Sequence, residues 1–254
     1  RPTPSQSSAA SDVYKRQVTL DPKAWPMTWS DNLALARMAD EAGFEALLPV
    51  GRWRGYGGES NFNHRTFESF TWAAGIAAST RDIAVLATVH APLVHPLTAA
   101  KQAATIDHIS NGRFVMNIVC GWNRPEFEMF GAPWREHDRR YEYAAEWITL
   151  IQRLWTETEE FDFAGEFFQG KAMWSEPKPL QRPVPLMNAG SSPAGQSFSA
   201  RHCDMNFVML RQRSERTDAA QIDHLKRMAA DHARHSHCWI HGYVVCRETR
   251  AEAQ

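Results

Sequence analysis

The stretch over residues 104–122, ATIDHISNGRFVMNIVCGW, constrains the fold of this chain more than any other part of the sequence. Ile106 and Ile109 are apolar at a helical spacing, and Asn111-Gly112 is typical of the left-handed turn that ends a helix. The apolar run over 114–119 then predicts a buried strand. A helix that passes into a strand through so short a turn is typical of parallel α/β proteins, whose functional side chains gather at the carboxyl ends of the strands.

The same order of helix, short turn, strand and loop repeats along the chain, and no reversal of the strand order is indicated. The sequence therefore predicts an α/β fold, a (β/α)8 TIM barrel of which this chain holds a part. Ser30 is the expected N-cap of the first helix, and Gly43 is expected to end it. Strands are expected at 44–50, 83–89, 114–119, 184–188, 205–210 and 242–246, a hairpin at 161–168, and helices at 66–79, 96–110, 140–155, 193–200, 218–235 and 249–254.

Composition excludes several classes of function. The formal net charge is -1 and no basic tract carries interleaved aromatic residues, which argues against a nucleic-acid-binding protein. No apolar run reaches the roughly 18 residues of a membrane-spanning helix. The four cysteines form no CxxC pair and no cluster with histidine at zinc spacing, so we expect no metal site and a cytoplasmic protein with free thiols.

Both ends of the chain are unusual. Residues 1–17, RPTPSQSSAASDVYKRQ, have neither the apolar run of a signal peptide nor an amphipathic period, and SDVYKRQ looks like a translated sequencing adapter. The last expected helix, 249–254, has barely begun where the chain stops. We therefore expect a non-native segment over 1–17 and an incomplete barrel domain over 18–254, truncated at both ends.

Hydrolytic chemistry finds little support in the sequence. No two carboxylates recur as an acid–base pair, and no helix carries HExxH. Ser192, His90 and Asp204 could form a triad on paper. However, the segment AGSSPAG around Ser192 lacks the GxSxG turn that exposes a nucleophilic serine.

Polar residues gather at the predicted carboxyl ends of strands, Arg52, His90, Asn117, Ser191 and Ser192 among them, and the long polar segment after Trp122 adds Glu126, Arg140 and Tyr141. Arg140, Tyr141, Ser191 and Ser192 offer hydrogen bonds that suit a phosphate, and Ser192 precedes a helix whose first N–H groups favour an anion. Asn117 is an amide within an apolar strand, where a ligand would satisfy it. Plainer interpretations stay open: Arg140-Tyr141 as a helix start, Glu126 as a surface acid, and the loop GRWRGYGG over 51–58 as a surface loop rather than an active-site loop.

Three motifs, ATIDHISNGRF, VMNIVCGWNRPEFEMFG and RRYEY, together resemble the bacterial luciferase-like flavin monooxygenases. The similarity is strongest to the group that includes the pyrimidine, alkanesulfonate and dimethylsulfone monooxygenases, and it runs from about Trp25 to Cys246. It implies a barrel that binds reduced FMN (FMNH2) from a separate flavin reductase and uses O2 to oxidise a small substrate, and it implies a homo-oligomer. The family's flavin contacts correspond to Gly51, Arg52, Asn117, Glu126, Arg140, Tyr141 and Ser192.

Within this resemblance Ser192 and Tyr141 would hold the phosphate, and Asn117 would face the flavin ring. Arg52 or Arg54 could attract an anionic substrate, and no catalytic acid or base is identifiable. A deazaflavin-dependent oxidoreductase of the same fold and a non-catalytic flavin-binding fragment remain alternatives. The substrate pocket is expected to include Trp53, Arg54, His90 and Trp122, with Phe207 as a further wall.

Overall fold

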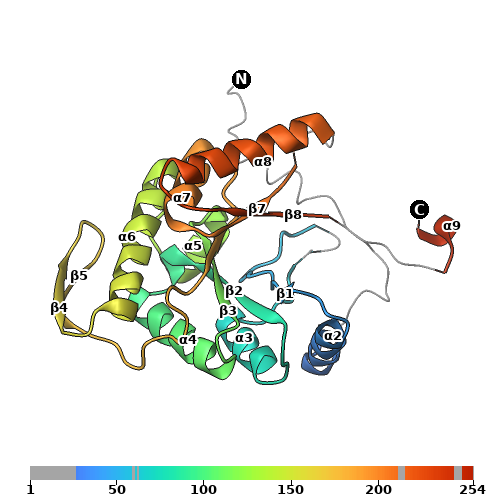
Figure 1. Cartoon of the computed structure of the whole chain (residues 1–254), viewed down its shortest axis with the longest axis horizontal. Helices are drawn as coiled ribbons and strands as arrows, with labels where there is room; N and C mark the ends of the chain where they lie inside the picture. The colour runs from blue at the N-terminus through green and yellow to red at the C-terminus, as the bar shows by residue number, and fades with distance from the viewer. Residues whose placement is uncertain (1–26, 59–60, 62, 211–214, 243–247, 254) are drawn as a thin grey trace. The chain divides into compact units, whose positions relative to one another are not determined.

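Three parallel strands form the sheet of the first part of the molecule: β1 (Ala46–Leu47), β2 (Ala84–His90) and β3 (Phe114–Val119) (Figure 1). The computed structural model describes residues 27–58, 61, 63–210, 215–242 and 248–253. These residues belong to two compact units, Arg1–Leu186 and Met187–Gln254. In the first unit Thr88 lies opposite Asn117 and His90 opposite Val119, so Thr88, His90 and Asn117 share one face near the carboxyl ends of the strands.

Helices of the first unit cover this sheet. They are α2 (Trp29–Glu41), α3 (Ser69–Ala77), α4 (Pro96–Ile109), α5 (Arg124–Phe130) and α6 (His137–Thr156), with a 3-10 turn at Ala91–Leu93. Helix α3 packs on β2, and α4 packs on α6. Two tryptophans fix α6 in place, because their indole N–H groups donate to backbone carbonyls, from Trp147 to Val94 and from Trp155 to Ala100.

The turn between α4 and β3 confirms the prediction from Asn111-Gly112. Asn111 has φ 54° and Gly112 has φ 80°, both in the left-handed region that ends helices. Arg113 follows and donates to three carbonyl oxygens, those of Ile83, Ala77 and Thr80, which fastens β3 to the start of β2 and the end of α3. The amino end of the sheet is thereby closed by hydrogen bonds.

A two-stranded hairpin, β4 (Phe161–Ala164) and β5 (Gln169–Met173), follows α6 (Figure 1). The prediction of a hairpin is confirmed, although its second arm extends to Met173 rather than ending at Phe168. The carboxylate of Glu146 on α6 accepts the backbone N–H groups of the hairpin turn, residues 166–168. One side chain therefore ties the hairpin to the helix.

The second unit repeats the order of strand and helix. Strand β6 (Leu186–Asn188), helix α7 (Pro193–His202), strand β7 (Met205–Val208), helix α8 (Glu215–Ala230), strand β8 (His237–Ile240) and helix α9 (Arg250–Ala253) follow one another. The three strands pair in parallel, β6 with β7 and β7 with β8. Asn206 on β7 links helix α7 to the residue before β8, because it accepts from Ser199 and donates to Ser236.

Several predictions for the first strand and helix were wrong. The strand over 44–50 is reduced to Ala46–Leu47, with Phe44 65% and Val50 54% exposed, because β1 pairs on one side with β2 and its flanks are not covered. Thr28 rather than Ser30 is the N-cap of α2, and Ala36 is the buried residue of this helix.

Two further elements differ from the prediction. The polar stretch after Trp122 contains the unpredicted helix α5, which begins at Arg124, has Pro125 in its first turn and ends at Gly131, at φ 63°. The last strand within the described residues is β8 at His237–Ile240. Most of the expected strand over 242–246, with Cys246, lies outside them, as does the segment 1–17. Among the described helices, neither the longest, α6, nor any other combines the length and apolar character that a bilayer crossing requires.

Candidate active site

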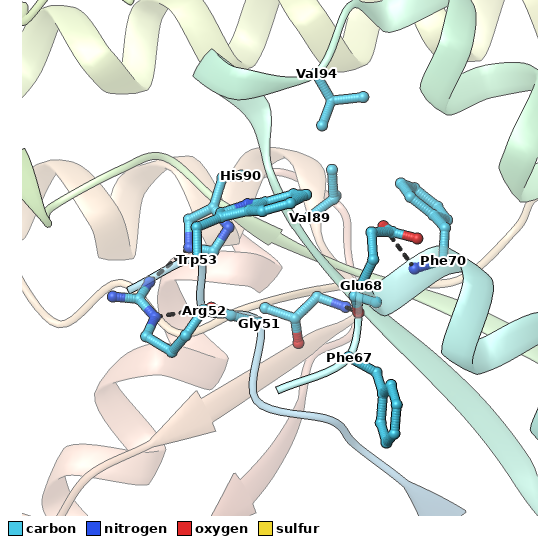
Figure 2. Close-up of a pocket in the computed structure, with 11 residues that line it drawn as sticks. Gly51, Arg52, Trp53, Phe67, Glu68, Phe70, Val89, His90 and Val94 are labelled. Atoms are coloured by element: carbon cyan, nitrogen blue, oxygen red, sulfur yellow. Dashed lines mark hydrogen bonds between the residues drawn. The ribbon is translucent and has the colours of Figure 1, made fainter. Parts of the chain in front are cut away.

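Arg52, His90 and Glu126 form a buried cluster at the carboxyl ends of β1 and β2. Figure 2 shows Arg52 and His90 of this cluster, joined by a dashed line. Nη2 of Arg52 lies 2.6 Å from Nε2 of His90 and 3.3 Å from Oε2 of Glu126, and His90 Nε2 lies 3.8 Å from the same carboxylate oxygen. The three side chains are only 4%, 4% and 1% exposed. A charged pair this deeply buried is retained at an energetic cost, which marks the cluster as a functional candidate.

Local geometry brings the glycine-rich loop into this cluster. A Cβ at Gly51 would lie 2.8 Å from the carbonyl oxygen of Thr88, so a side chain does not fit where the loop leaves β1. Glu126, in the first turn of α5, accepts the backbone N–H groups of Trp53 (2.8 Å) and Arg54 (3.4 Å) through Oε1. The carboxylate therefore holds the loop against α5, while the Arg54 side chain itself is exposed.

His90 is neutral in this environment. Burial, and after it the positive charge of Arg52, lowers the pKa of His90 from 6.5 to about 3. Nε2 then carries a lone pair that accepts from Arg52, and the ring proton lies on Nδ1. Within the cluster the charge of Arg52 is thus balanced by Glu126 alone.

Aromatic rings enclose the cluster on one side. The guanidinium of Arg52 lies 4.8 Å from the centre of the Trp122 ring, and Tyr56 stacks on Trp122 with their ring centres 5.9 Å apart. Trp53 meets the edge of Phe130 at 4.9 Å. The expected pocket residues Trp53, His90 and Trp122 therefore lie around Arg52.

Asn117 lies on β3 beside Thr88. Its Nδ2 donates to Thr88 Oγ1 over 3.1 Å, and that hydroxyl donates to the carbonyl of Pro49. Its Oδ1 is buried and has no hydrogen-bond partner within the described part of the chain. Sequence reasoning missed Thr88, although its position two residues before His90 on the same strand places both on one face.

Arg140 and Tyr141 lie near the amino end of α6, where the first turn of the helix passes into the second. Arg140 donates to the carbonyl of Gly121, stacks 4.5 Å from the Trp134 ring centre, and has a buried Nε without a partner among the described residues. Burial lowers the pKa of the Arg140 guanidinium. Tyr141 is half-buried, with its ring centre 5.3 Å from that of His137.

Ser192 belongs to the second unit, where it is the N-cap of α7. Its Oγ accepts the N–H of Gly195 over 3.1 Å, and Pro193 follows at the first helical position. The cap uses the oxygen as an acceptor and leaves the hydroxyl hydrogen able to donate. Phe207, an expected pocket wall, also lies in this unit, on β7.

A hollow of about 310 Å³, part of it open to solvent, lies beside the cluster in the first unit (Figure 2). No group of three or more histidine, cysteine or acidic side chains that could hold a metal ion occurs within the ranges that the structure describes. The hollow is lined by Gly51, Arg52, Trp53, Phe67, Glu68, Ser69, Phe70, Thr88, Val89, His90 and Val94.

Known proteins resemble this chain in sequence and in structure. A family model described as luciferase-like monooxygenase matches residues 6–254. Pyrimidine monooxygenase RutA of Acinetobacter baylyi is 37% identical over 225 residues, which cover 87% of this chain and 60% of that protein. The FMNH2-dependent dimethylsulfone monooxygenase of Pseudomonas putida is 35% identical over 225 residues, 88% of this chain and 60% of that protein.

The chain thus spans about 60% of the length of these curated relatives. Among solved structures, EDTA monooxygenase (EmoA) from Chelativorans sp. BNC1 superposes with a TM-score of 0.76 at 20% identity, over 87% of this chain and 58% of that one. The predicted luciferase-like α/β fold is thereby confirmed.

Proposed function

The chain belongs to the luciferase-like monooxygenase family, and from this premise we propose that it binds reduced FMN and uses it with O2 to oxidise a small substrate. The observation that carries the proposal is the unpartnered Oδ1 of Asn117. A buried carbonyl oxygen without a donor is costly, and an N–H group of a flavin ring would satisfy it.

The remaining donors fit the phosphate end of FMN. In the first unit Arg140 keeps a buried N–H group without a partner among the described residues, and we assign Arg140 and Tyr141 to the phosphate. In the second unit Ser192 can donate its hydroxyl hydrogen from a helix N-terminus, and its assignment to the phosphate rests on the family resemblance alone. Gly51 and Arg52 would contact the flavin through their backbone, and Glu126, whose two oxygens are used within the protein, would act by holding their loop.

Reduced FMN, when bound, supplies the two electrons with which one atom of O2 enters the substrate and the other becomes water. The protein's own part is to bind, to orient and to exclude bulk water. Trp53 and Trp122 cover the cluster, and Thr88 holds the amide of Asn117 in one orientation through its hydroxyl. No side chain is assigned as a general base.

We also propose a separate flavin reductase as partner, a homo-oligomer, and action in the cytoplasm, all on the strength of family membership. Pyrimidines and dimethylsulfone are the substrates that the relatives' names indicate, and alkanesulfonates are a third class. A deazaflavin-dependent oxidoreductase and a non-catalytic flavin carrier are the competing functions.

The direct test compares Asn117→Leu with a matched control, Gln102→Leu. Both changes remove a buried amide oxygen that has no partner within the described part of the chain, but Gln102 lies on α4. We expect Asn117→Leu to weaken FMN binding, measured anaerobically by fluorescence titration, by about tenfold or more, and Gln102→Leu to leave it unchanged. Equal affinity of both variants would contradict the assignment of Asn117.

Oxygen uptake with FMN, NADH, a generic flavin reductase and uracil separates the competing functions. A monooxygenase consumes O2 above the reductase control and forms an oxidised product. A carrier consumes no more than the control. Tighter binding of a deazaflavin than of FMN would replace the proposal with the deazaflavin-dependent function.

A further inference from the structure

We propose that the β4–β5 hairpin supports the first turn of α6, and that Phe167, in the turn of the hairpin, is a positioning residue for the phosphate of FMN. Phe167 does not contact the flavin. It acts through Arg140 and Tyr141 near the amino end of α6, the residues that the proposed function assigns to the phosphate. The inference therefore rests on that function and extends it to an element outside the site.

The start of α6 has no side-chain cap. Glu136 is the N-cap residue, but its side chain makes no capping hydrogen bond. The first N–H groups of a helix have no partner within the helix, so an uncapped first turn opens easily. Trp147 and Trp155 fasten α6 through their indole N–H groups, but they lie further along the helix. The turn that carries Arg140 therefore depends on support from another element.

The hairpin contacts one stripe of α6, beside which it lies (Figure 1). The residues of this stripe follow one another at helical spacing and so share one face of the helix. They are Arg139, Tyr143, Glu146 and Arg153. The adjoining stripe begins with Arg140 and continues through the buried Ala144 and Trp147. Neighbouring residues are about 100° apart around a helix, so fixing the first stripe also fixes the direction of Arg140.

Phe167 is the main contact of the hairpin with the start of α6. The guanidinium groups of Arg139 and Arg135 lie 4.8 and 5.5 Å from the centre of its half-buried ring. The ring of Tyr143 lies 5.3 Å away, and Arg135 stacks on that ring at 4.2 Å. Arg139 also pairs with Glu166 of the hairpin turn, but both side chains are exposed, and such a pair contributes little.

The turn that presents Phe167 is itself fixed. Glu146 accepts its three backbone N–H groups, those of residues 166–168, over 2.7 to 2.9 Å. A Cβ at Gly165 would collide with the same carboxylate, so the turn approaches the helix this closely only with glycine there. Phe168 is buried against Tyr143, with the ring centres 4.9 Å apart. Removing the Phe167 ring therefore leaves the hairpin attached and takes away its contact with the helix start.

A rigid helix start matters most for the phosphate. Arg140 donates to the carbonyl of Gly121 and keeps a buried Nε without a partner among the described residues. When such a donor is already held in place, the binding of an anion does not have to order it, and the affinity rises. The flavin ring, by contrast, is assigned to Asn117 on β3, which the hairpin does not touch. Support from the hairpin should therefore favour FMN over a flavin without a phosphate.

The test compares FMN with riboflavin, which has the same ring but no phosphate. Both reduced flavins are titrated anaerobically against the full chain by fluorescence. Phe167→Ala should weaken FMN binding about fivefold or more and leave riboflavin binding within about twofold of the wild type. Phe167→Tyr, which keeps the ring, should bind both flavins like the wild type. Phe161→Ala is the matched control, because it removes a ring of the same hairpin that lies 3.9 Å from the guanidinium of Arg153, and it should change neither affinity.

Hydrogen exchange of the flavin-free chain, measured by mass spectrometry, gives a second result that needs no ligand. The backbone amides of residues 138–142 should exchange faster in Phe167→Ala than in the wild type, and at the wild-type rate in Phe161→Ala. Glu166→Gln should change the exchange and the FMN affinity in the same direction by a smaller factor. Because the Glu166 side chain is 61% exposed, this variant supplies the test if Phe167→Ala does not fold.

Equal losses of FMN and riboflavin affinity in Phe167→Ala, unchanged exchange at the start of α6, or the same effects in Phe161→Ala would overturn the inference. Equal affinity of the wild type for FMN and riboflavin would instead reject the assignment of Arg140 and Tyr141 to the phosphate. Faster exchange in Phe167→Ala would then still uphold the support of α6 by the hairpin, so the two failures are distinguishable.

Discussion

Each end of the β2–β3 pair carries an arginine, and the two arginines are used differently. At the amino end, Arg113 donates with both terminal nitrogens, to the carbonyls of Ile83, Ala77 and Thr80. At the carboxyl end, Arg52 is fixed by Glu126 and His90 but keeps Nη1 without a partner within the described residues. Both terminal nitrogens of Arg113 therefore have acceptors, whereas one terminal nitrogen of Arg52 has none within the described residues.

The same contrast holds for the buried acids and amides at the two ends. Asp107 on α4 accepts the backbone N–H and the side-chain amide of Gln181 with its two carboxylate oxygens, and so fastens the segment around Gln181 to α4. Asn117 at the other end keeps an unused oxygen. In barrels of this class the amino end of the strands serves stability and the carboxyl end serves function. The difference teaches that a buried polar atom without a partner indicates a ligand site only where it also lies at the carboxyl end of the strands, because Gln102 on α4 has such an atom too.

The largest effect is expected from Arg113→Met. The change removes several charge-assisted hydrogen bonds and leaves carbonyls at the start of β2 without donors, so the free energy of unfolding should fall by about 4 kcal/mol. Urea unfolding followed by circular dichroism measures it. Arg81→Met, at an exposed arginine of the same end, should change the unfolding free energy little.

If the free energy of unfolding of Arg113→Met fell by less than about 1 kcal/mol, the comparison would be contradicted, because the hydrogen bonds of Arg113 would then contribute little to stability. The slope of the unfolding free energy against urea concentration must be the same in the variant and the wild type, so that the change in midpoint reports a change in stability.

An intermediate effect is expected from His90→Gln at acidic pH. The unfolded chain binds a proton at this histidine below its ordinary pKa of 6.5, whereas the folded chain binds it only near pH 3. The free energy of unfolding of the wild type therefore falls as the pH drops from 6.5 towards 3. Between neutral pH and about pH 4.5 the wild type should lose roughly 2 kcal/mol more than His90→Gln does.

Urea unfolding of both proteins at a series of pH values checks this prediction. His202, whose pKa burial lowers to about 4, titrates in both proteins and cancels from the difference. Parallel stability curves for the two proteins would show that His90 takes up its proton at its ordinary pKa in the folded chain. The cluster of Arg52, His90 and Glu126 would then carry an additional positive charge at acidic pH.

The smallest effect is expected from Asp40→Asn at the amino end. The backbone N–H of Arg81, with those of Ile83 and Asp82, lowers the pKa of the Asp40 carboxyl from 3.8. Its contribution is present above pH 3.8 and is lost as the pH falls below that value. Because the group is near solvent, the variant should be less stable at neutral pH by under about 1 kcal/mol.

The difference between Asp40→Asn and the wild type should shrink in unfolding experiments below about pH 4, as the wild-type carboxyl takes up its proton. A difference that stays constant from neutral to acidic pH would assign the effect to packing rather than to charge.

Much of the candidate site could be predicted from residue type and position. Arg52, His90 and Asn117 were selected because they stand at the ends of apolar strands, and the structure places all three at that end. Glu126 was a candidate from its place in the long polar segment after Trp122, but residue type alone left a surface acid equally open, and only the structure shows that it is buried. Thr88 was missed because a threonine within a strand is ordinary unless its neighbours are known.

The fold could be predicted where local and global preferences agree. The turn at Asn111-Gly112 and strand β3 follow from local rules, since a left-handed turn and a fully apolar strand have few alternatives. The strand around Phe44 could not be predicted, because burial of an edge depends on which neighbour covers it.

The amino-acid sequence by itself determined the alternation of helices and strands, the position of the strand ends and the membership of the family. Only the tertiary structure decided that Arg52, His90 and Glu126, which are far apart along the chain, share a buried cluster. It also decided which of their polar atoms have partners. The physical reason is that periodicity and propensity act between near neighbours, whereas the satisfaction of a buried donor depends on groups that meet only after folding.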